Sequence, residues 1–279
     1  MNNEIVMLFQ DGIKKALTFS YDDGTIHDRK FVALMNQYGM RGTFNLNSGI
    51  FGSRERKLSN GIETDFSRID EEEVKALYEG HEISAHTSTH PSLTEISIEK
   101  GKEEVIKDCE KLEALAGYPI TGFAYPYGTY NDQVEKMLDE CGITYARTVV
   151  STEDFELPQK FLEWHATCHH DTPKLMELAE RFVKEQPIEA SVFYIWGHSY
   201  EFTRDNNWDM IENFFRYMKE NGEGIWFATN REIADYTLAF RKLEISSDGK
   251  ILFNPTEMDL WYGLNGQTYC IRGKEKKEL

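Results

Sequence analysis

Two short strings of polar residues stand directly after probable strands and offer side chains that bind metals. Asp22 and Asp23 follow the apolar run at residues 16–19, and His86 and His90 follow the run at residues 82–85. A catalytic zinc site keeps three protein ligands and leaves one position open for water, and a carboxylate with two imidazoles is a suitable mixed set. One aspartate and both histidines therefore form a candidate metal centre, and the other aspartate is left for acid–base chemistry.

Each string also has an ordinary interpretation. Asp-Asp-Gly is a common turn, because aspartate bonds its own backbone and glycine supplies a positive φ. Two histidines four residues apart on a helix would share one face, but Pro91 biases His90 away from the helical region. This favours a strand end followed by a tight loop. The two strings together, each at a strand exit, indicate a site more strongly than either one alone.

Four motifs in the correct order make the chain resemble a known family. They are TFSYDDG at residues 18–24, HTSTH at 86–90, FAYPYG at 123–128 and WGH at 196–198. The chain resembles the polysaccharide deacetylases, which are carbohydrate esterase family 4 and share the NodB-homology fold, over roughly residues 13–240. The first two motifs are specific, the third is altered, and the last is short.

The resemblance implies a role for each matched residue. It makes Asp22 the general base and His198 the general acid, although a histidine at an apolar strand exit is by itself more often structural. The metal ligands are then Asp23, His86 and His90, with one divalent metal, zinc first and cobalt, nickel or manganese as alternatives. The oxyanion is shared by the metal and the backbone N–H of Tyr127. Asp154 and Trp164 are candidates for orienting the general acid and walling the pocket.

The third motif departs from the family at one position. The family places an arginine there to orient the base aspartate, and this chain has Ala124. A carboxylate without its guanidinium partner loses a stabilising charge. Arg147, near the end of the next predicted strand, either supplies that charge from a different direction or forms a plain ion pair at the barrel rim. A further cluster of donor groups is interpreted as a hydrogen-bonded loop rather than a metal site: His165, Cys168, His169 and His170.

Composition excludes several classes of partner. The net charge of −17 argues against nucleic acid or an anionic membrane surface, because clustered Lys and Arg drive both kinds of binding. Residues 274–277 are the basic exception and are predicted as a solvated tail. The four cysteines include no CxxC pair, which favours reduced thiols. Residues 1–10 lack the basic and apolar regions of a signal peptide, so a cytoplasmic location is expected.

Short apolar runs alternate with amphipathic segments along most of the chain. Strands are predicted at residues 13–20, 41–46, 81–85, 122–125, 143–149, 191–196 and 224–228, and helices at 70–79, 97–116, 132–140, 173–185 and 208–221. This pattern indicates an α/β fold with a parallel sheet. Periodicity alone equally allows a doubly wound sheet, whereas the resemblance implies a distorted (β/α)7 barrel of NodB type. Active sites of parallel barrels lie at the C-terminal strand ends, where the motifs fall.

The pattern changes after residue 240. Short alternating runs separated by turn residues predict a small C-terminal antiparallel β appendage. We therefore expect two domains, a NodB-like deacetylase barrel at 1–240 and an appendage at 241–279 packed on the barrel. Trp261 and Tyr262 either pack the appendage against the barrel or bind sugar, and packing is the favoured interpretation.

The expected function is a metal-dependent hydrolase that removes N-acetyl or O-acetyl groups from a carbohydrate, with an acetylated sugar or oligosaccharide as substrate. Two alternatives stay open, because a fold and its metal do not determine the acyl substrate. One is a hydrolase of a non-sugar linear amide. The other is a catalytically weak carbohydrate-binding protein that keeps the metal as an anchor. Turnover discriminates between them. The sequence leaves the oligomeric state open.

Overall fold

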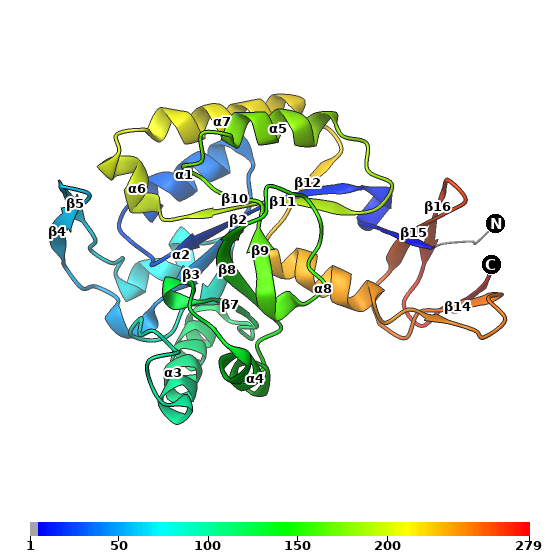
Figure 1. Ribbon diagram of the computed structural model, residues 1–279, viewed down its shortest axis with the longest axis horizontal. Helices are drawn as coiled ribbons and strands as arrows, with labels where there is room; N and C mark the ends of the chain where they lie inside the picture. Colours follow the sequence, from blue (N-terminus) through cyan, green and yellow to red (C-terminus); the bar gives the residue numbers. More distant parts are fainter. Residues whose placement is uncertain (1–4) are drawn as a thin grey trace.

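The computed structural model describes residues 5–279, and a parallel sheet rolled into a nearly closed barrel forms its centre (Figure 1). Eight strands follow one another in the order β10-β11-β2-β3-β6-β7-β8-β9. Their bounds are β2 Lys15–Asp22, β3 Thr43–Leu46, β6 Glu82–Ala85, β7 Gly122–Ala124, β8 Tyr145–Ser151, β9 Trp164–Ala166, β10 Cys168–His169 and β11 Ser191–Gly197. A further strand, β12 (Ile225–Phe227), pairs with the first half of β2. Residues 1–4 of the predicted barrel domain lie outside the described range.

Two very short strands close the sheet. β9 pairs in parallel with β8, and β10 pairs in parallel with β11, although only one residue separates β9 from β10. The run at residues 164–169 therefore links the two ends of the sheet. This confirms the predicted barrel over the doubly wound alternative.

Helices cover the outside of the barrel. Their bounds are α1 Asp28–Tyr38, α2 Val74–Leu77, α3 Ile98–Ala116, α4 Asp132–Glu140, α5 Leu175–Lys184, α6 Ser199–Arg204, α7 Trp208–Asn221 and α8 Asn230–Phe240. In Figure 1, α1, α5 and α7 lie on one side of the barrel and α3 and α4 on the other. Gly39 and Gly117 end α1 and α3 in the left-handed conformation, as helix C-terminal glycines commonly do. The predicted helices omit α1, α6 and α8.

Alternation along β2 places the chemistry at the barrel's C-terminal end. Leu17 and Phe19 face outward into the large apolar core under the helices. Thr18 and Ser20 point the other way, and their hydroxyls hydrogen-bond to Asn230 (2.7 Å) and Asn45 (2.8 Å). Because successive side chains of a strand alternate, Asp22 is the last inward position of β2. It therefore lies at the mouth of a polar barrel interior.

The remaining strands are antiparallel. They are β1 Val6–Leu8, β4 Arg56–Ser59, β5 Ile62–Asp65, β13 Glu244–Ile245, β14 Ile251–Phe253, β15 Leu260–Leu264, β16 Gln267–Ile271 and β17 Lys276–Glu278. β4 and β5 form a hairpin, β15 and β16 form a sheet with β1, and β14 pairs with β13 and β17. The prediction of a solvated basic tail is wrong, because that segment runs into β17, whose backbone pairs with β14.

The C-terminal strands pack on the barrel through a second apolar core. Tyr262 and Leu260 belong to it, together with Ala16 at the start of β2 and Val192 at the start of β11. Figure 1 shows these strands at the end of the barrel opposite β4, β5 and α6. The buried Tyr262 thus packs against the barrel. The domain boundary at residue 240 stays a prediction, and β1 joins the C-terminal sheet from the N-terminal side of it.

No helix within residues 5–279 has both the length and the apolar character needed to cross a membrane.

Candidate metal centre and active site

The predicted site residues converge on one cavity at the C-terminal ends of the strands. Its volume is about 490 Å³, and Asp22, Asp23, His86, His90, Tyr127 and His198 all line it. Arg147 is buried beside it at 1% exposure. Side chains from the exits of β2, β6 and β11 and from the loop after β7 thus meet in one place.

Asp23, His86 and His90 form a group whose donor atoms lie within 4.8 Å of one another. The Asp23 Oδ1 to His90 Nε2 distance is 3.7 Å, and the two imidazole rings are 4.7 Å apart at their centroids. Asp23 and His90 both have positive φ, at 83° and 63°, which turns each side chain back over the strand ends. The positive φ is tolerated by Asp, Asn and His more readily than by branched residues.

The protonation of this group suits a divalent cation. His86 Nδ1 donates to the Ala124 carbonyl at 2.7 Å, which leaves the Nε2 lone pair free, and burial lowers the pKa of His86 to about 4. Asp23 Oδ1 is buried and has no hydrogen bond of good geometry among the described residues, although Arg68 Nη1 lies 2.9 Å away. Burial alone raises the pKa of Asp23, but Arg68 and the histidines outweigh it and hold the carboxyl ionised. One anionic oxygen and two neutral imidazoles fit a metal site.

Asp22 is held from two directions. Asn45 Nδ2 donates to its Oδ1 at 2.8 Å, and Arg147 Nη2 donates to its Oδ2 in an ion pair that is almost fully buried. Burial by itself raises the pKa of Asp22, but Arg147, with smaller contributions from His86 and His198, lowers it below its usual range. Asp22 is therefore a carboxylate with fixed orientation.

The position of Arg147 explains how the chain accommodates Ala124. The two residues are register partners on the adjacent parallel strands β7 and β8. The guanidinium thus reaches Asp22 from one strand further along the barrel than the family's arginine position. The Trp196 ring lies against it, with 4.3 Å between Arg147 Cζ and the ring centroid.

His198 follows β11 and meets a glutamate that the sequence did not single out. Its backbone N–H donates to Glu201 Oε2 at 3.1 Å, and its Nδ1 lies 3.3 Å from the same oxygen. Its Nε2 faces Asp22 Oδ2 at 3.9 Å. Burial alone lowers the pKa of His198, but the hydrogen bond and the charge of Glu201 raise it to about 9. His198 therefore carries two protons at neutral pH.

The sequence-based predictions missed Arg68, which lines the cavity, and Glu201, which contacts His198 behind it. Glu201 is the third residue after His198, and this spacing is the capping-box pattern at the start of α6, so a local signal existed. Arg68 follows the β4–β5 hairpin and also donates to the Asp23 carbonyl. No local pattern marks it. The proposed orienting residue Asp154 bonds its own loop at Phe155 N, and Trp164 is wholly buried in the second apolar core; neither lines the cavity.

Tyr127 is the exposed wall of the cavity. Its φ is 58°, within the short turn that follows β7, and its ring lies 4.6 Å from that of His90. The Tyr127 ring therefore lies beside one of the candidate metal ligands.

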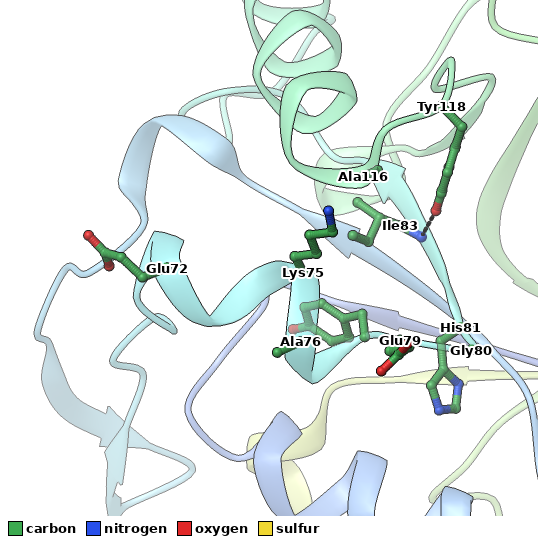
Figure 2. A pocket seen from close by; sticks show the side chains of 10 residues that line it. Glu72, Lys75, Ala76, Glu79, Gly80, His81, Ile83, Ala116 and Tyr118 are labelled. Atoms are coloured by element: carbon green, nitrogen blue, oxygen red, sulfur yellow. Dashed lines mark hydrogen bonds between the residues drawn. The ribbon is translucent and has the colours of Figure 1, made fainter.

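A larger cavity, of about 590 Å³, lies away from this site. Figure 2 shows it between α2 and the start of β6, where Ile83 N–H donates to the Tyr118 hydroxyl at 2.8 Å. In Figure 2, Lys75 points toward Ile83 and Glu72 points away from it. Among the described residues, the groups with metal-ligand spacing lie elsewhere. Volume alone therefore does not identify the reactive site of this molecule.

Comparison with known proteins supports the motif assignment. The profile of the polysaccharide deacetylase family matches residues 10–146. The chain is 26% identical over 145 residues to a peptidoglycan-N-acetylglucosamine deacetylase of Bacillus cereus, covering 51% of this chain and 47% of that protein. It is 29% identical over 130 residues to the peptidoglycan-N-acetylmuramic acid deacetylase PdaC of Bacillus subtilis, covering 46% of this chain and 25% of that protein. The chain thus spans about half or less of the curated relatives it matches.

Solved structures share the fold. A Mycobacterium smegmatis protein assigned to the polysaccharide deacetylases superposes with a TM-score of 0.62 at 15% identity, covering 86% of this chain and 96% of that one. The Xyl-CE4 domain of a multidomain xylanase from the hindgut metagenome of Trinervitermes trinervoides gives 0.52 at 14% identity, covering 81% and 92%. Residues 10–146, just under half of the chain, are similar to the polysaccharide deacetylase family, as the motifs predict.

Proposed function

We propose that this protein is a divalent-metal-dependent deacetylase that removes acetyl groups from an amino sugar or its oligomer. The observation that carries the proposal is the convergence of an ionised, doubly held Asp22 and a three-donor metal group on one open cavity. The metal group is Asp23, His86 and His90, and zinc suits its nitrogen and oxygen donors. When bound, such a metal polarises an acyl oxygen and lowers the pKa of water.

The chain's own residues supply the proton transfers. Asp22 accepts the proton of the attacking water, and Arg147 and Asn45 keep its carboxylate ionised and oriented. His198 begins the reaction with protons on both nitrogens and gives one to the departing nitrogen or oxygen of the sugar. Glu201 fixes the His198 ring through Nδ1, so that Nε2 faces the cavity.

The developing oxyanion needs a donor in addition to the cation. The backbone N–H of Tyr127 is the candidate, because it lies in the turn beside His90 at the cavity wall. A backbone donor fixed by a turn needs no reorganisation during the reaction. The Tyr127 side chain is exposed and suits contact with a sugar ring.

The relatives and the aromatic lining of the cavity support a proposal for the substrate class. The Bacillus relatives are named for deacetylation of peptidoglycan N-acetylglucosamine and N-acetylmuramic acid. Aromatic side chains of Tyr127, Trp196 and Tyr200 line the cavity here, and such rings bury apolar sugar faces while leaving polar edges free. We propose an acetylated sugar or oligosaccharide as the substrate.

The test is acetate release from a panel of acetylated sugars, including chitin oligomers and peptidoglycan fragments, with zinc or cobalt supplied.

Asp22→Asn is expected to keep one tightly bound metal after dialysis and to lose about 10²- to 10⁴-fold in rate, because an amide cannot accept the water proton. His86→Ala combined with His90→Ala should lose the tightly bound metal. Undiminished metal in the dialysed double variant rejects the ligand assignment. Loss of metal from Asp22→Asn means that the aspartates have the opposite roles.

A second candidate function is a metal-anchored carbohydrate-binding protein. The observation that favours it is Ala124, which departs from the family's arginine beside the base. Reproducible sugar binding by the metal-loaded protein, with no acetate released from any sugar of the panel, decides for this alternative.

A further inference from the structure

A second group of metal-donor side chains lies beside the first, on the far side of His198. His169 Nε2 and His198 Nδ1 lie 3.2 and 3.3 Å from Glu201 Oε2, and the donor atoms of all three residues lie within 4.8 Å of one another. His169 is on β10 and His198 follows β11, and these strands are parallel neighbours. The exits of two adjacent strands and the first turn of α6 thus build the group.

Two of the three separations are close to those between ligands of a bound transition metal. Ligands at about 2.0–2.2 Å from a tetrahedral zinc stand about 3.3–3.6 Å apart, since they subtend about 109° at the metal. The two distances from Glu201 Oε2 are close to this edge length. The three side chains retain between 11% and 21% exposure, so a hydrated cation can reach the group from solvent.

Both ring nitrogens of His169 face carboxylate oxygens. Nδ1 lies 2.6 Å from Asp171 Oδ1, and Nε2 lies 3.2 Å from Glu201 Oε2. A ring nitrogen and a carboxylate oxygen at this distance need a proton or a metal cation between them, because two lone pairs would otherwise face each other. A carboxylate behind a ligating imidazole is also the usual outer support of a metal site.

Glu201 Oε2 has more nitrogen neighbours than it can accept hydrogen bonds from. His198 N lies at 3.1 Å, and His170 Nε2 at 3.5 Å, in addition to the two ring nitrogens of the group. His170 itself is fully buried with its Nδ1 3.0 Å from the Tyr21 hydroxyl. Three imidazole rings thus surround one anionic oxygen.

We propose that His169, His198 and Glu201 bind a second divalent transition-metal ion and that its binding inhibits the enzyme. The sequence led us to expect one metal per chain, and this group adds a weaker site to that expectation. It is weaker because the cation must displace the proton on His198 Nδ1 and because Arg204 Nη2 already lies 3.6 Å from Glu201 Oε1.

Inhibition is expected because one imidazole nitrogen cannot bind a proton and a metal ion at the same time. An imidazolium needs protons on both nitrogens, and a nitrogen whose lone pair binds a metal cannot hold one. The metal-bound form of His198 therefore cannot be the doubly protonated acid that serves the leaving group. This consequence rests on the proposed function, whereas the metal site itself does not.

Zinc binding at equilibrium tests the site without any activity measurement. The wild type is expected to take up two equivalents of zinc, the second more weakly, and His169→Gln only the first. His165→Gln is the matched control, because His165 lies on β9 and pairs instead with Thr148. The double variant His86→Ala/His90→Ala should retain the weak equivalent, and Co²⁺ in its place should give a visible absorption band that disappears when His169→Gln is added.

Activity then tests the consequence. The deacetylation rate of the wild type should fall over the zinc range in which the second equivalent binds, and His169→Gln should lose this inhibition while His165→Gln keeps it. A single equivalent in the wild type at saturating zinc, or two equivalents in His169→Gln, overturns the site. A second equivalent with no fall in rate overturns the inhibition alone. If no substrate is turned over, the proposed function fails while the stoichiometry still decides the site.

Discussion

At the scale of single residues, Asp22, the proposed general base, is held by an arginine on β8. Ala124 and Arg147 are register partners, so the guanidinium reaches Asp22 from the strand next to the one that carries Ala124. A charged hydrogen bond buried in a low-dielectric interior is stronger than one in water. Arg147 is thus a positioning residue for Asp22.

Arg147→Ala should lower kcat by about 10- to 100-fold, the equivalent of the 1.5–3 kcal/mol typical of hydrogen bonds to charged groups. Arg147→Lys should recover only part of the rate, because a point charge does not reproduce the geometry of a guanidinium. Metal content should stay at the wild-type level in both, since Arg147 contacts none of the proposed ligands. The measurements are kcat, KM and bound metal on protein whose melting temperature shows it to be folded. An unchanged kcat in Arg147→Ala contradicts the positioning role.

The site residues differ in how far the sequence could predict them. Four of the site residues stand in recognisable motifs at strand ends: Asp22, Asp23, His86 and His90. Because parallel strands end at the same edge of a sheet, the prediction of a parallel sheet also predicted that these residues lie close together. Arg68 comes from an insertion whose path depends on the hairpin's packing, and no local pattern records that path. The contact of His169 with Glu201 depends on the register of β10 with β11. The sequence did not predict that register, because a strand of two residues is too short to show a periodic pattern.

At the scale of elements, a helix outside the barrel holds the loops that carry the metal group. Asp108 is a fully buried residue of α3, and its two oxygens accept from Ser48 N at 2.8 Å and His86 N at 2.9 Å. One carboxylate thus ties the loops after β3 and β6 to the helix. Burial raises the pKa of Asp108 to about 7, against the lowering effect of these hydrogen bonds.

Asp108→Asn should weaken metal binding by about 10-fold or more, as changes to residues that support metal ligands commonly do. The amide offers one accepting oxygen for two backbone donors. Either Ser48 N loses its side-chain acceptor, or His86 N keeps only its bond to the Leu46 carbonyl at 3.1 Å and its link to α3 is lost. The measurement is the zinc dissociation constant of the tight site. Glu103→Gln, an exposed change on the same helix, is the control. Equal zinc affinity in Asp108→Asn and the wild type shows that α3 does not position His86.

The elements themselves were predicted unevenly, for a physical reason. Strands β2, β6 and β11 are buried segments that end at turn or loop residues, and α3 and α7 are long enough to show a helical period. The strands that close the barrel, β9 and β10, hold three and two residues and cannot show either pattern. The barrel's closure is therefore a property of the three-dimensional packing, which the family resemblance supplied and periodicity did not.

At the scale of the whole molecule, the two ends of the barrel have separate tasks. The C-terminal strand ends carry the candidate chemistry, and the opposite end is closed by the C-terminal strands and by α8. The apolar alternation after residue 240 predicted those strands, and the burial of Tyr262 in the shared core explains why its aromatic ring is there. What the sequence could not give is the polar network inside the barrel, because its members come from distant segments.

Glu82 is the centre of that network at the closed end. It is fully buried at the start of β6, and it accepts hydrogen bonds from Tyr145 Oη at 2.6 Å, Thr43 Oγ1 at 2.7 Å and Arg231 N at 2.9 Å. These donors come from β8, β3 and α8. Burial outweighs their lowering effect and raises the pKa of Glu82 to about 7.

This raised pKa predicts a stability that falls with pH. Between about pH 4.5, the ordinary value, and about pH 7, the folded protein holds a proton on Glu82 that the unfolded chain has released. The folded state binds more protons in that window, so its free energy of unfolding decreases as pH rises through it. At 1.36 kcal/mol per pKa unit the loss amounts to about 3 kcal/mol.

Glu82→Gln cannot ionise, so its stability relative to the wild type should rise by up to this amount between pH 5 and pH 8. Urea unfolding at both pH values measures the free energy of unfolding of the variant relative to the wild type. The other buried carboxyls, Asp28 and Asp108, contribute equally to both proteins, so their effect cancels. Glu63→Gln, an exposed change on β5, should run parallel to the wild type, and parallel behaviour of Glu82→Gln contradicts the assignment.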